Sequence, residues 1–304
     1  RTTSSNYKNE FIAFNKEQAF MPQFVQQIDN QAISTISNVD YVIVTYPEYK
    51  AEAERLANAH QLYSGVNTAV VTTEQVYNEF GSGSQDISAI RDFFKMLYEH
   101  GNLKYALLFG DGSYDFKERI PNNTNMVPTY QSEASRGLGT TYVSDDFYGM
   151  LDDTDVGLHP LQIDIAIGRL PAATRAEAKV LVDKTLSYFS PDSNLGSPFG
   201  DWRSKIMFVV DDDNPGPNNA FHHTVDEDAA QFLEQNEPAY TLRKLYMDAF
   251  LQEGSSGGLR YPAVTDAIVN GIETGTLLVN YFGHGGVNGW AQERVFTPNE
   301  IREL

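Results

Sequence analysis

The stretch Tyr41–Tyr46 (YVIVTY) is a short, continuous run of β-branched and aromatic residues. Apolar residues at helical spacing follow from about Tyr49 to Leu62, and Gly65 closes that segment. A continuous apolar strand followed by an amphipathic helix is typical of a parallel sheet with helices on both faces. This stretch therefore predicts an α/β fold.

The same alternation recurs along the rest of the chain. Further strands are predicted at 67–72, 105–110, 163–168, 205–210, 241–246 and 276–281, and helices at 86–99, 174–189, 219–234 and 263–272. Residues 190–200 (SPDSNLGSPFG) are rich in Pro, Gly and Ser, which predicts a linker. We expect two doubly wound α/β subdomains with mainly parallel sheets, lying side by side at 40–189 and 201–304, and a segment at 1–39 that connects to an upstream domain.

A helix start is predicted close to the end of the sequence. Thr297-Pro298-Asn299-Glu300 combines an N-cap, a proline at the first helical position and a capping-box glutamate. Only four residues follow Glu300, too few for a stable helix. We therefore expect the natural protein to continue and the second subdomain to be incomplete.

Composition excludes several classes of protein. The 304 residues contain 41 Asp plus Glu against 22 Lys plus Arg, a formal net charge of −19, which argues against a nucleic-acid binder. Apolar runs are short compared with the roughly 18 residues that a membrane-spanning helix needs. The sequence has no cysteine, which excludes a disulfide scaffold, a cysteine-ligated zinc site and a thiol nucleophile within these residues.

His284 is the most informative histidine. It lies in Tyr281-Phe282-Gly283-His284-Gly285-Gly286, directly after a predicted strand. Ligands of open α/β sheets bind at the carboxyl ends of the strands, and flanking glycines let backbone N–H groups approach a substrate. The motif predicts a catalytic imidazole, with a plain turn as the alternative.

Carboxylates also follow two predicted strands, at Asp111 and at Asp211–Asp213, and a further pair, Asp145-Asp146, lies in a predicted loop. Carboxylate oxygens are the ligands that calcium prefers, but acids are also common where a strand ends in solvent, and this spacing matches no EF-hand. We therefore assign no metal ligands and leave calcium as a possibility without support. The adjacent His222 and His223 do not converge on one ion when they lie on a helix. Asp164 interrupts the apolar run 163–167, where a carboxylate needs a partner such as an imidazole unless it faces solvent.

From Asp40 to Leu304 the sequence resembles the gingipain-type cysteine peptidases, which share a clan with the caspases. Within that family it is most similar to the sortase branch of the type IX secretion system. The matching stretches keep their order and comprise YVIVTYPE (41–48), EQVYNEF (74–80), QDISAIRDF (85–93), LLFGDGSYDF (107–116), SDDFYG (144–149), DIAIGRL (164–170) and LVNYFGHGGVNGW (278–290).

This resemblance implies a caspase-like fold and a catalytic Cys–His dyad. His284 matches the catalytic imidazole, and Gly285 matches a backbone donor of the oxyanion hole. Asp164 matches the acid that orients the imidazole, although gingipains carry Glu there. Gly283 and Trp290 match positions near the substrate. The family's cysteine lies a few tens of residues beyond the histidine, so we expect this fragment alone to be inactive.

The sortase branch further implies partners and a location. Its substrates are secreted proteins with C-terminal sorting domains, its partner is an outer-membrane protein of the secretion system, and anionic lipopolysaccharide is a possible acceptor. The resemblance implies no required cofactor and places the protein at the cell surface, peripheral to the bacterial outer membrane. Two alternatives remain: a non-catalytic surface module for binding or structure, and a metal-dependent phosphohydrolase or nucleotide-binding domain built on Asp111 and Asp211–Asp213.

Overall fold

The chain divides into two compact units, Arg1–Val182 and Asp183–Leu304. The computed structural model describes residues 13–24, 27–134, 136–137, 140–152, 162–189, 199–212 and 221–304. The division falls within helix α4 (Arg175–Ser187). Of the expected linker 190–200, only the last two residues are among the described ones. Each unit is described by itself below.

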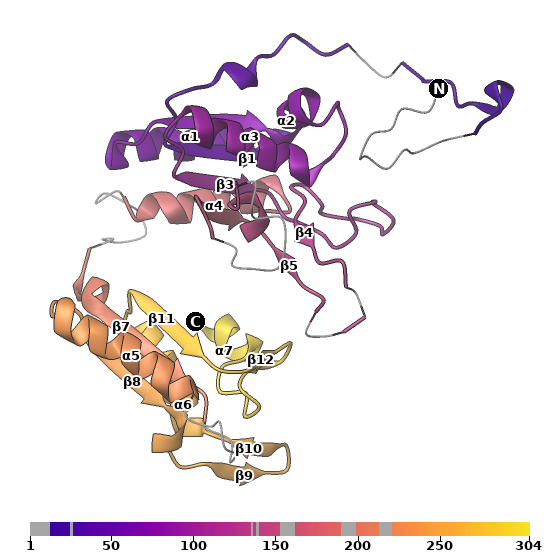
Figure 1. Cartoon of the computed structure of the whole chain (residues 1–304). Coiled ribbons are helices and arrows are strands. Elements are labelled where there is room, and N and C mark those ends of the chain that lie inside the picture. Colours follow the sequence, from indigo (N-terminus) through magenta and orange to yellow (C-terminus); the bar gives the residue numbers. More distant parts are fainter. Residues whose placement is uncertain are drawn as a thin grey trace, which may run out of the picture. The chain divides into compact units, whose positions relative to one another are not determined.

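The first unit is built on a four-stranded parallel sheet with the order β2–β1–β3–β6 (Figure 1). Its strands are β1 (Tyr41–Thr45), β2 (Thr68–Thr72), β3 (Tyr105–Phe109) and β6 (Ala166–Leu170). All five residues of β1 are buried, as expected for a strand covered on both faces. The run YVIVTY therefore forms the centre of this sheet.

Three helices accompany these strands before α4: α1 (Lys50–Ala59), α2 (Thr73–Phe80) and α3 (Ile87–His100). The apolar face of α3, with Phe93 and Phe94, packs in one buried cluster with Val42, Val44 and Leu108 of the sheet. Helix α1 continues into a π-helical turn at His60–Ser64. Helix α2 was not expected from periodicity.

The second unit is built on a three-stranded parallel sheet with the order β11–β7–β8. Its strands and main helices are β7 (Lys205–Val210), β8 (Thr241–Tyr246), β11 (Leu278–Phe282), α5 (Phe221–Asn236) and α6 (Pro262–Glu273). Met207 and Val209 pack in the same cluster as residues of α6, whereas Ile206 and Phe208 pack with Ala230 of α5. Alternate residues of β7 thus face opposite helices, which confirms the α/β fold with mainly parallel sheets.

The remaining elements are short. Three small hairpins are formed by β4 (Tyr130–Gln131) with β5 (Val143–Ser144), β9 (Glu253–Ser255) with β10 (Gly258–Arg260), and β12 (Gly285–Gly286) with β13 (Gly289–Trp290). Single 3₁₀ turns occur at Lys16–Gln18, Ile33–Thr35, Pro47–Tyr49, Asp146–Tyr148, Asp201–Ser204 and Met247–Ala249. The predicted capping box of Thr297 and Glu300 is present and starts α7 (Pro298–Glu303).

One predicted strand needs correction. The apolar run suggested a strand at 163–168, but the ladder with β3 begins only at Ala166 and continues to Leu170. Asp164 therefore precedes the strand instead of interrupting it. Within the described part of the chain, no helix has both the length and the apolar character needed to span a bilayer.

Candidate active site

His284 lies in the turn that leaves β11. In the parallel sheet, Phe282 of β11 is paired with Val210 of β7, so the two strands end side by side. Asp211 directly follows β7, and its N–H donates to the carbonyl of Phe282 over 3.0 Å. The sheet therefore places an acid and an imidazole at the same carboxyl edge, where α/β proteins bind ligands.

The Asp211 carboxylate holds this turn through two contacts. Its Oδ2 accepts the backbone N–H of His284 at 2.9 Å and lies 3.1 Å from Nδ1 of the same residue. An ionised carboxylate only accepts hydrogen bonds, so this contact assigns the proton to Nδ1 and leaves Nε2 for a reacting group. The Asp211 side chain is 3% exposed and that of His284 is 73% exposed. A buried acid thus orients a solvent-accessible imidazole.

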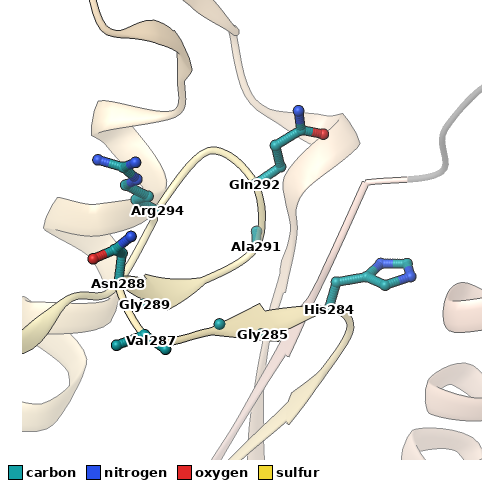
Figure 2. Close-up of a pocket in the computed structure, with 9 residues that line it drawn as sticks. His284, Gly285, Val287, Asn288, Gly289, Ala291, Gln292 and Arg294 are labelled. Atoms are coloured by element: carbon teal, nitrogen blue, oxygen red, sulfur yellow. The ribbon is translucent and has the colours of Figure 1, made fainter. Parts of the chain in front are cut away.

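A shallow cavity of about 270 Å³ lies beside His284. It is formed by the β12–β13 hairpin and the loop that follows, and Figure 2 shows the imidazole pointing away from this loop. Val287 at the tip of the hairpin is 97% exposed. The lining residues are His284, Gly285, Gly286, Val287, Asn288, Gly289, Ala291, Gln292 and Arg294.

Aromatic packing fixes the backbone of the His284 turn. The carbonyl of His284 accepts the hydroxyl of Tyr281 at 2.6 Å and the N–H of Ala291 at 2.8 Å. The Tyr281 ring stacks on Trp290 with centroids 4.6 Å apart, and burial together with the nearby Asp211 carboxylate raises the pKa of Tyr281. Trp290 therefore has a packing role in the core of this unit, and its contact with substrate stays a prediction.

Gly283 and Gly285 differ in how much room they have. A Cβ atom on Gly283 would lie 2.6 Å from the hydroxyl oxygen of Tyr281 and 2.9 Å from Oδ2 of Asp211, and closer still to the Asp211 Cβ. A Cβ on Gly285 would meet nothing within 4 Å. Gly283 is thus required for the approach of Asp211 to the turn. The oxyanion role of Gly285 and the substrate contact of Gly283 stay predictions.

A third carboxyl group lies near this edge. Glu293 is 8% exposed, and burial together with the charges of Asp212 and Asp211 raises its pKa. One of its oxygens, one of Asp211 and one of Asp212 lie within 4.8 Å of one another. The folded state therefore favours the protonated form of Glu293.

This arrangement predicts a pH-dependent effect of Glu293→Gln. A raised folded-state pKa means that the fold binds the proton more tightly than the unfolded chain, so the carboxyl destabilises the fold increasingly as pH rises above its ordinary value of 4.5. We expect the variant to melt at a higher temperature than the parent at pH 8, with the difference shrinking toward pH 4. Tryptophan fluorescence reports on the second unit, because both tryptophans, Trp202 and Trp290, belong to it. A difference that grows toward pH 4 would contradict this prediction.

The neighbouring histidines of α5 face different partners. The ring of His222 contacts Phe282 and His284 edge-on, with centroids 5.5 and 5.1 Å away. The ring of His223 instead lies 5.0 Å from that of Tyr246, and its Nε2 is 3.3 Å from Asp248. The two rings thus lie against different groups, as expected for adjacent residues on a helix that do not converge on one ion. The approach of His222 to His284 was not foreseen.

Asp164 has a different set of contacts. Its Oδ2 accepts the N–H groups of Leu151 at 2.7 Å and Asp152 at 3.3 Å, so it closes the loop that precedes β6. It lies at the amino end of its strand, whereas His284 follows the carboxyl end of β11. The two residues belong to different units, and a contact between them stays a prediction. Within its own unit, the imidazole has Asp211 as its carboxylate partner.

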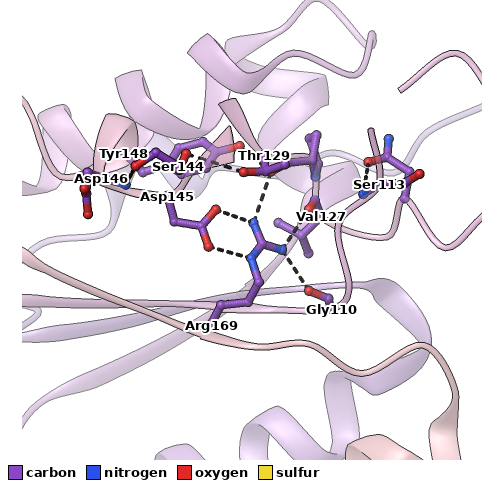
Figure 3. A network of polar contacts seen from close by, with 11 residues as sticks. Gly110, Ser113, Val127, Thr129, Ser144, Asp145, Asp146, Tyr148 and Arg169 are labelled. Atoms are coloured by element: carbon purple, nitrogen blue, oxygen red, sulfur yellow. Dashed lines mark hydrogen bonds and ion pairs between the residues drawn. The ribbon is translucent and has the colours of Figure 1, made fainter. Parts of the chain in front are cut away.

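Asp145 takes part in a polar network centred on Arg169 of β6 (Figure 3). The guanidinium donates to both oxygens of Asp145 at 2.7 Å, and to the carbonyls of Gly110 and Val127 at 2.8 Å and of Pro128 at 3.3 Å. A planar fork of donors suits this bidentate pairing, which a lysine cannot reproduce. Arg169 therefore ties the loops after β3 to the edge of the sheet.

We predict that Arg169→Lys lowers the free energy of unfolding by about 2–4 kcal/mol, because it breaks a largely buried ion pair and leaves carbonyls without donors. Urea unfolding followed by far-UV circular dichroism measures this loss. Arg175→Lys is the matched control: Arg175 is 73% exposed and pairs with Glu48, itself 51% exposed. An exposed pair of this kind contributes at most about 1 kcal/mol. Equal losses in the two variants would contradict the role given to Arg169.

The other strand-end acids have structural partners. Oδ2 of Asp111 accepts the hydroxyl of Thr124 at 2.5 Å, and its carbonyl accepts the N–H groups of Met126 and Val127. Asp212 accepts the hydroxyl of Tyr261 at 3.0 Å, and Asp213 lies outside the described residues. These contacts anchor loops and give no specific support to a phosphohydrolase or nucleotide site.

Comparisons with known proteins identify the family. The chain matches the model of peptidase family C25 over residues 34–304, and no curated protein matches it. It is similar to dimeric latent PorU from Porphyromonas gingivalis, with 33% identity over 57% of this chain and 18% of that chain, at a TM-score of 0.50.

Two more distant structures agree in fold. One is the complex of the pro- and mature domains of RgpB from P. gingivalis, with 21% identity over 87% of this chain and 52% of that chain and a TM-score of 0.56. The other is a protease with 17% identity over 89% of this chain and 50% of that chain and a TM-score of 0.57. The chain thus spans between about a fifth and a half of these proteins. Because the family match extends over nearly the whole sequence, the chain belongs to peptidase family C25, the gingipain-type cysteine peptidases.

Proposed function

We propose that this chain supplies the imidazole half of a cysteine-peptidase active site, and that the thiolate comes from sequence outside these 304 residues. The observation that carries the proposal is the pair formed by buried Asp211 and exposed His284 at the carboxyl edge of the second sheet. Asp211 acts as the positioning residue, and His284 acts as the general acid and base. Family membership supports the thiol as nucleophile.

The chemistry follows from these roles. The thiolate attacks the carbonyl carbon of a peptide bond, and the electron pair of the C=O bond moves onto the oxygen. The N–H groups of Gly285 and of the cysteine hold this oxyanion; loss of one such donor typically lowers the rate by about 10²–10³. Nε2 of His284 then protonates the leaving amine as the C–N bond breaks. The resulting thioester is released by water or by an incoming amine that loses its proton to His284.

We propose that the substrates are secreted proteins with C-terminal sorting domains. The 33% identity with PorU over 57% of the chain supports a place in the sortase branch of the family. On this proposal the enzyme works at the cell surface, peripheral to the outer membrane, beside an outer-membrane partner of the secretion system. An amine of anionic lipopolysaccharide would then compete with water for the thioester.

The proposal is tested with the full-length protein and a secreted substrate that carries its sorting domain. We expect removal of the sorting domain, complete loss of cleavage after alkylation with iodoacetamide, and a new C-terminus that is either a free acid or an amide with the acceptor amine, as read by mass spectrometry. The 304-residue chain alone should give no turnover. Cleavage that survives complete alkylation would overturn the cysteine mechanism, and binding of the sorting domain without cleavage would support the non-catalytic alternative.

A further inference from the structure

Three groups with metal-binding atoms converge beside the cavity of the second unit. The carboxylate of Asp211 and the imidazoles of His222 and His284 each bring one such atom to within 4.8 Å of the others. The two rings meet edge-on at 89° with centroids 5.1 Å apart. His222 in the first turn of α5 contacts Phe282, the last residue of β11, and the turn after the same strand carries His284.

The donor set fits zinc better than calcium. Two imidazole nitrogens and one carboxylate oxygen are ligands that Zn²⁺ commonly takes, whereas calcium and magnesium prefer oxygen alone. Tetrahedral ligands at about 2 Å from zinc lie about 3.3 Å apart. The His284 ring is 73% exposed, which leaves room for it to rotate toward the other two groups when a metal binds.

The carboxylate of Asp211 is already oriented for such a role. Its Oδ1 accepts the N–H of Asp212 at 3.1 Å, and its Oδ2 accepts the N–H of His284 at 2.9 Å. Hydrogen bonds of this kind fix the direction of a ligating carboxylate before the metal arrives. Three protein ligands leave one tetrahedral position open, as in zinc sites that exchange a water or another ligand.

We propose that Asp211, His222 and His284 form a Zn²⁺ site, and that zinc bound there inhibits the peptidase. Zinc bound at Nδ1, the nitrogen that faces Asp211, leaves the proton of the neutral ring on Nε2, so the ring cannot accept another proton there. The metal also takes the carboxylate that positions the ring. The binding itself requires only this chain. The inhibition rests on the proposed function, in which His284 transfers protons.

Zinc binding is measured on the 304-residue chain by competition with a chromophoric chelator, with Zn²⁺ as the sole added metal. We expect one site, weakened at least tenfold by His222→Ala and within twofold of the parent in His223→Ala. His223 is the matched control because it lies on the same turn of α5 and faces Asp248 and Tyr246 instead. Equal affinity of these two variants, or absence of a site in the parent, would overturn the proposal.

A second variant separates this site from the neighbouring carboxylates. Asp211, Asp212 and Glu293 also bring oxygens within 4.8 Å of one another, a set of acids alone. Glu293→Gln should leave zinc affinity within twofold if the metal binds at the histidines. X-ray absorption at the zinc edge of the parent chain adds a measurement that does not depend on the folding of a histidine variant. We expect scattering from two imidazoles, and scattering from fewer than two would overturn the ligand set.

The inhibitory role is tested on the full-length protein by the ratio of sorting-domain cleavage with and without added Zn²⁺. We expect the His223→Ala protein to be inhibited like the parent and the His222→Ala protein to need at least tenfold more zinc. Equal zinc sensitivity of the two variants would overturn the inhibition. A full-length protein without any peptidase activity would instead refute the proposed function, while the zinc titration of the chain would stand on its own.

Discussion

Replacing His284 by alanine in the full-length protein is expected to lower kcat/KM for sorting-domain cleavage by about 10³-fold or more. In the proposed mechanism the imidazole removes a proton from the nucleophile and returns it to the leaving amine, and loss of either member of such a pair typically leaves only the contribution of the oxyanion hole and substrate binding. The ring is 73% exposed, and its removal creates no core cavity, so the fold should persist. Steady-state cleavage kinetics at several substrate concentrations measure the effect.

The control for this substitution lies in the same unit. His223 is a neighbour of the site on α5, yet its ring contacts Tyr246 and not His284. Cleavage by His223→Ala should stay within twofold of the parent. Activity of His284→Ala within tenfold of the parent would reject the assignment of the catalytic imidazole, provided that circular dichroism shows a folded protein.

The strands were predictable because each buried strand is a continuous run of apolar residues in the sequence. The bounds of β7 and β8 coincide with the predicted 205–210 and 241–246, and β1 differs from its prediction by one residue. Continuous apolar runs of this kind are diagnostic for strands that are covered on both faces. The two-unit α/β architecture follows from such runs and the helical patterns between them.

The strand near Asp164 was misjudged for a physical reason. The apolar run begins at Ile163, and Ile165 is only 2% exposed, but the hydrogen-bonded ladder starts at Ala166. Burial therefore extends beyond the strand into the preceding loop, and hydrophobicity alone cannot separate the two. Helix α2 was missed for the opposite reason, since it is short and mostly polar, although the Thr72 and Gln75 capping box at its start could have revealed it.

The partnership of Asp211 with His284 could not be predicted because it depends on strand order. The two residues are far apart in sequence, and they meet only because β11 pairs with β7 instead of with β8. Local patterns do not determine which strands are neighbours. The available signal was that both residues directly follow an apolar strand, and parallel strands end at a common edge. The contact of His222, at the start of α5, with the ring of His284 likewise depends on tertiary structure and not on local sequence.

Gly283→Ala is expected to destabilise the second unit by about 1–3 kcal/mol, the usual range for forcing a methyl group into filled space. The new Cβ would lie 2.6 Å from the Tyr281 hydroxyl oxygen and 2.9 Å from Oδ2 of Asp211, so the turn or the acid must move. Either movement breaks the contact that orients His284. Catalysis by the full-length variant should therefore fall together with the melting temperature seen by tryptophan fluorescence.

Gly286→Ala is the matched control, because a Cβ at Gly286, in the same hairpin region, would meet nothing within 4 Å. Neither glycine has a positive φ, so alanine brings no backbone strain at either position and the comparison isolates the steric effect. We expect a melting temperature for Gly286→Ala equal to that of the parent or slightly higher, since alanine reduces the entropy of the unfolded chain. Equal stability of the two variants would mean that Asp211 does not pack against Gly283, and the orientation of the imidazole by this acid would have to be abandoned.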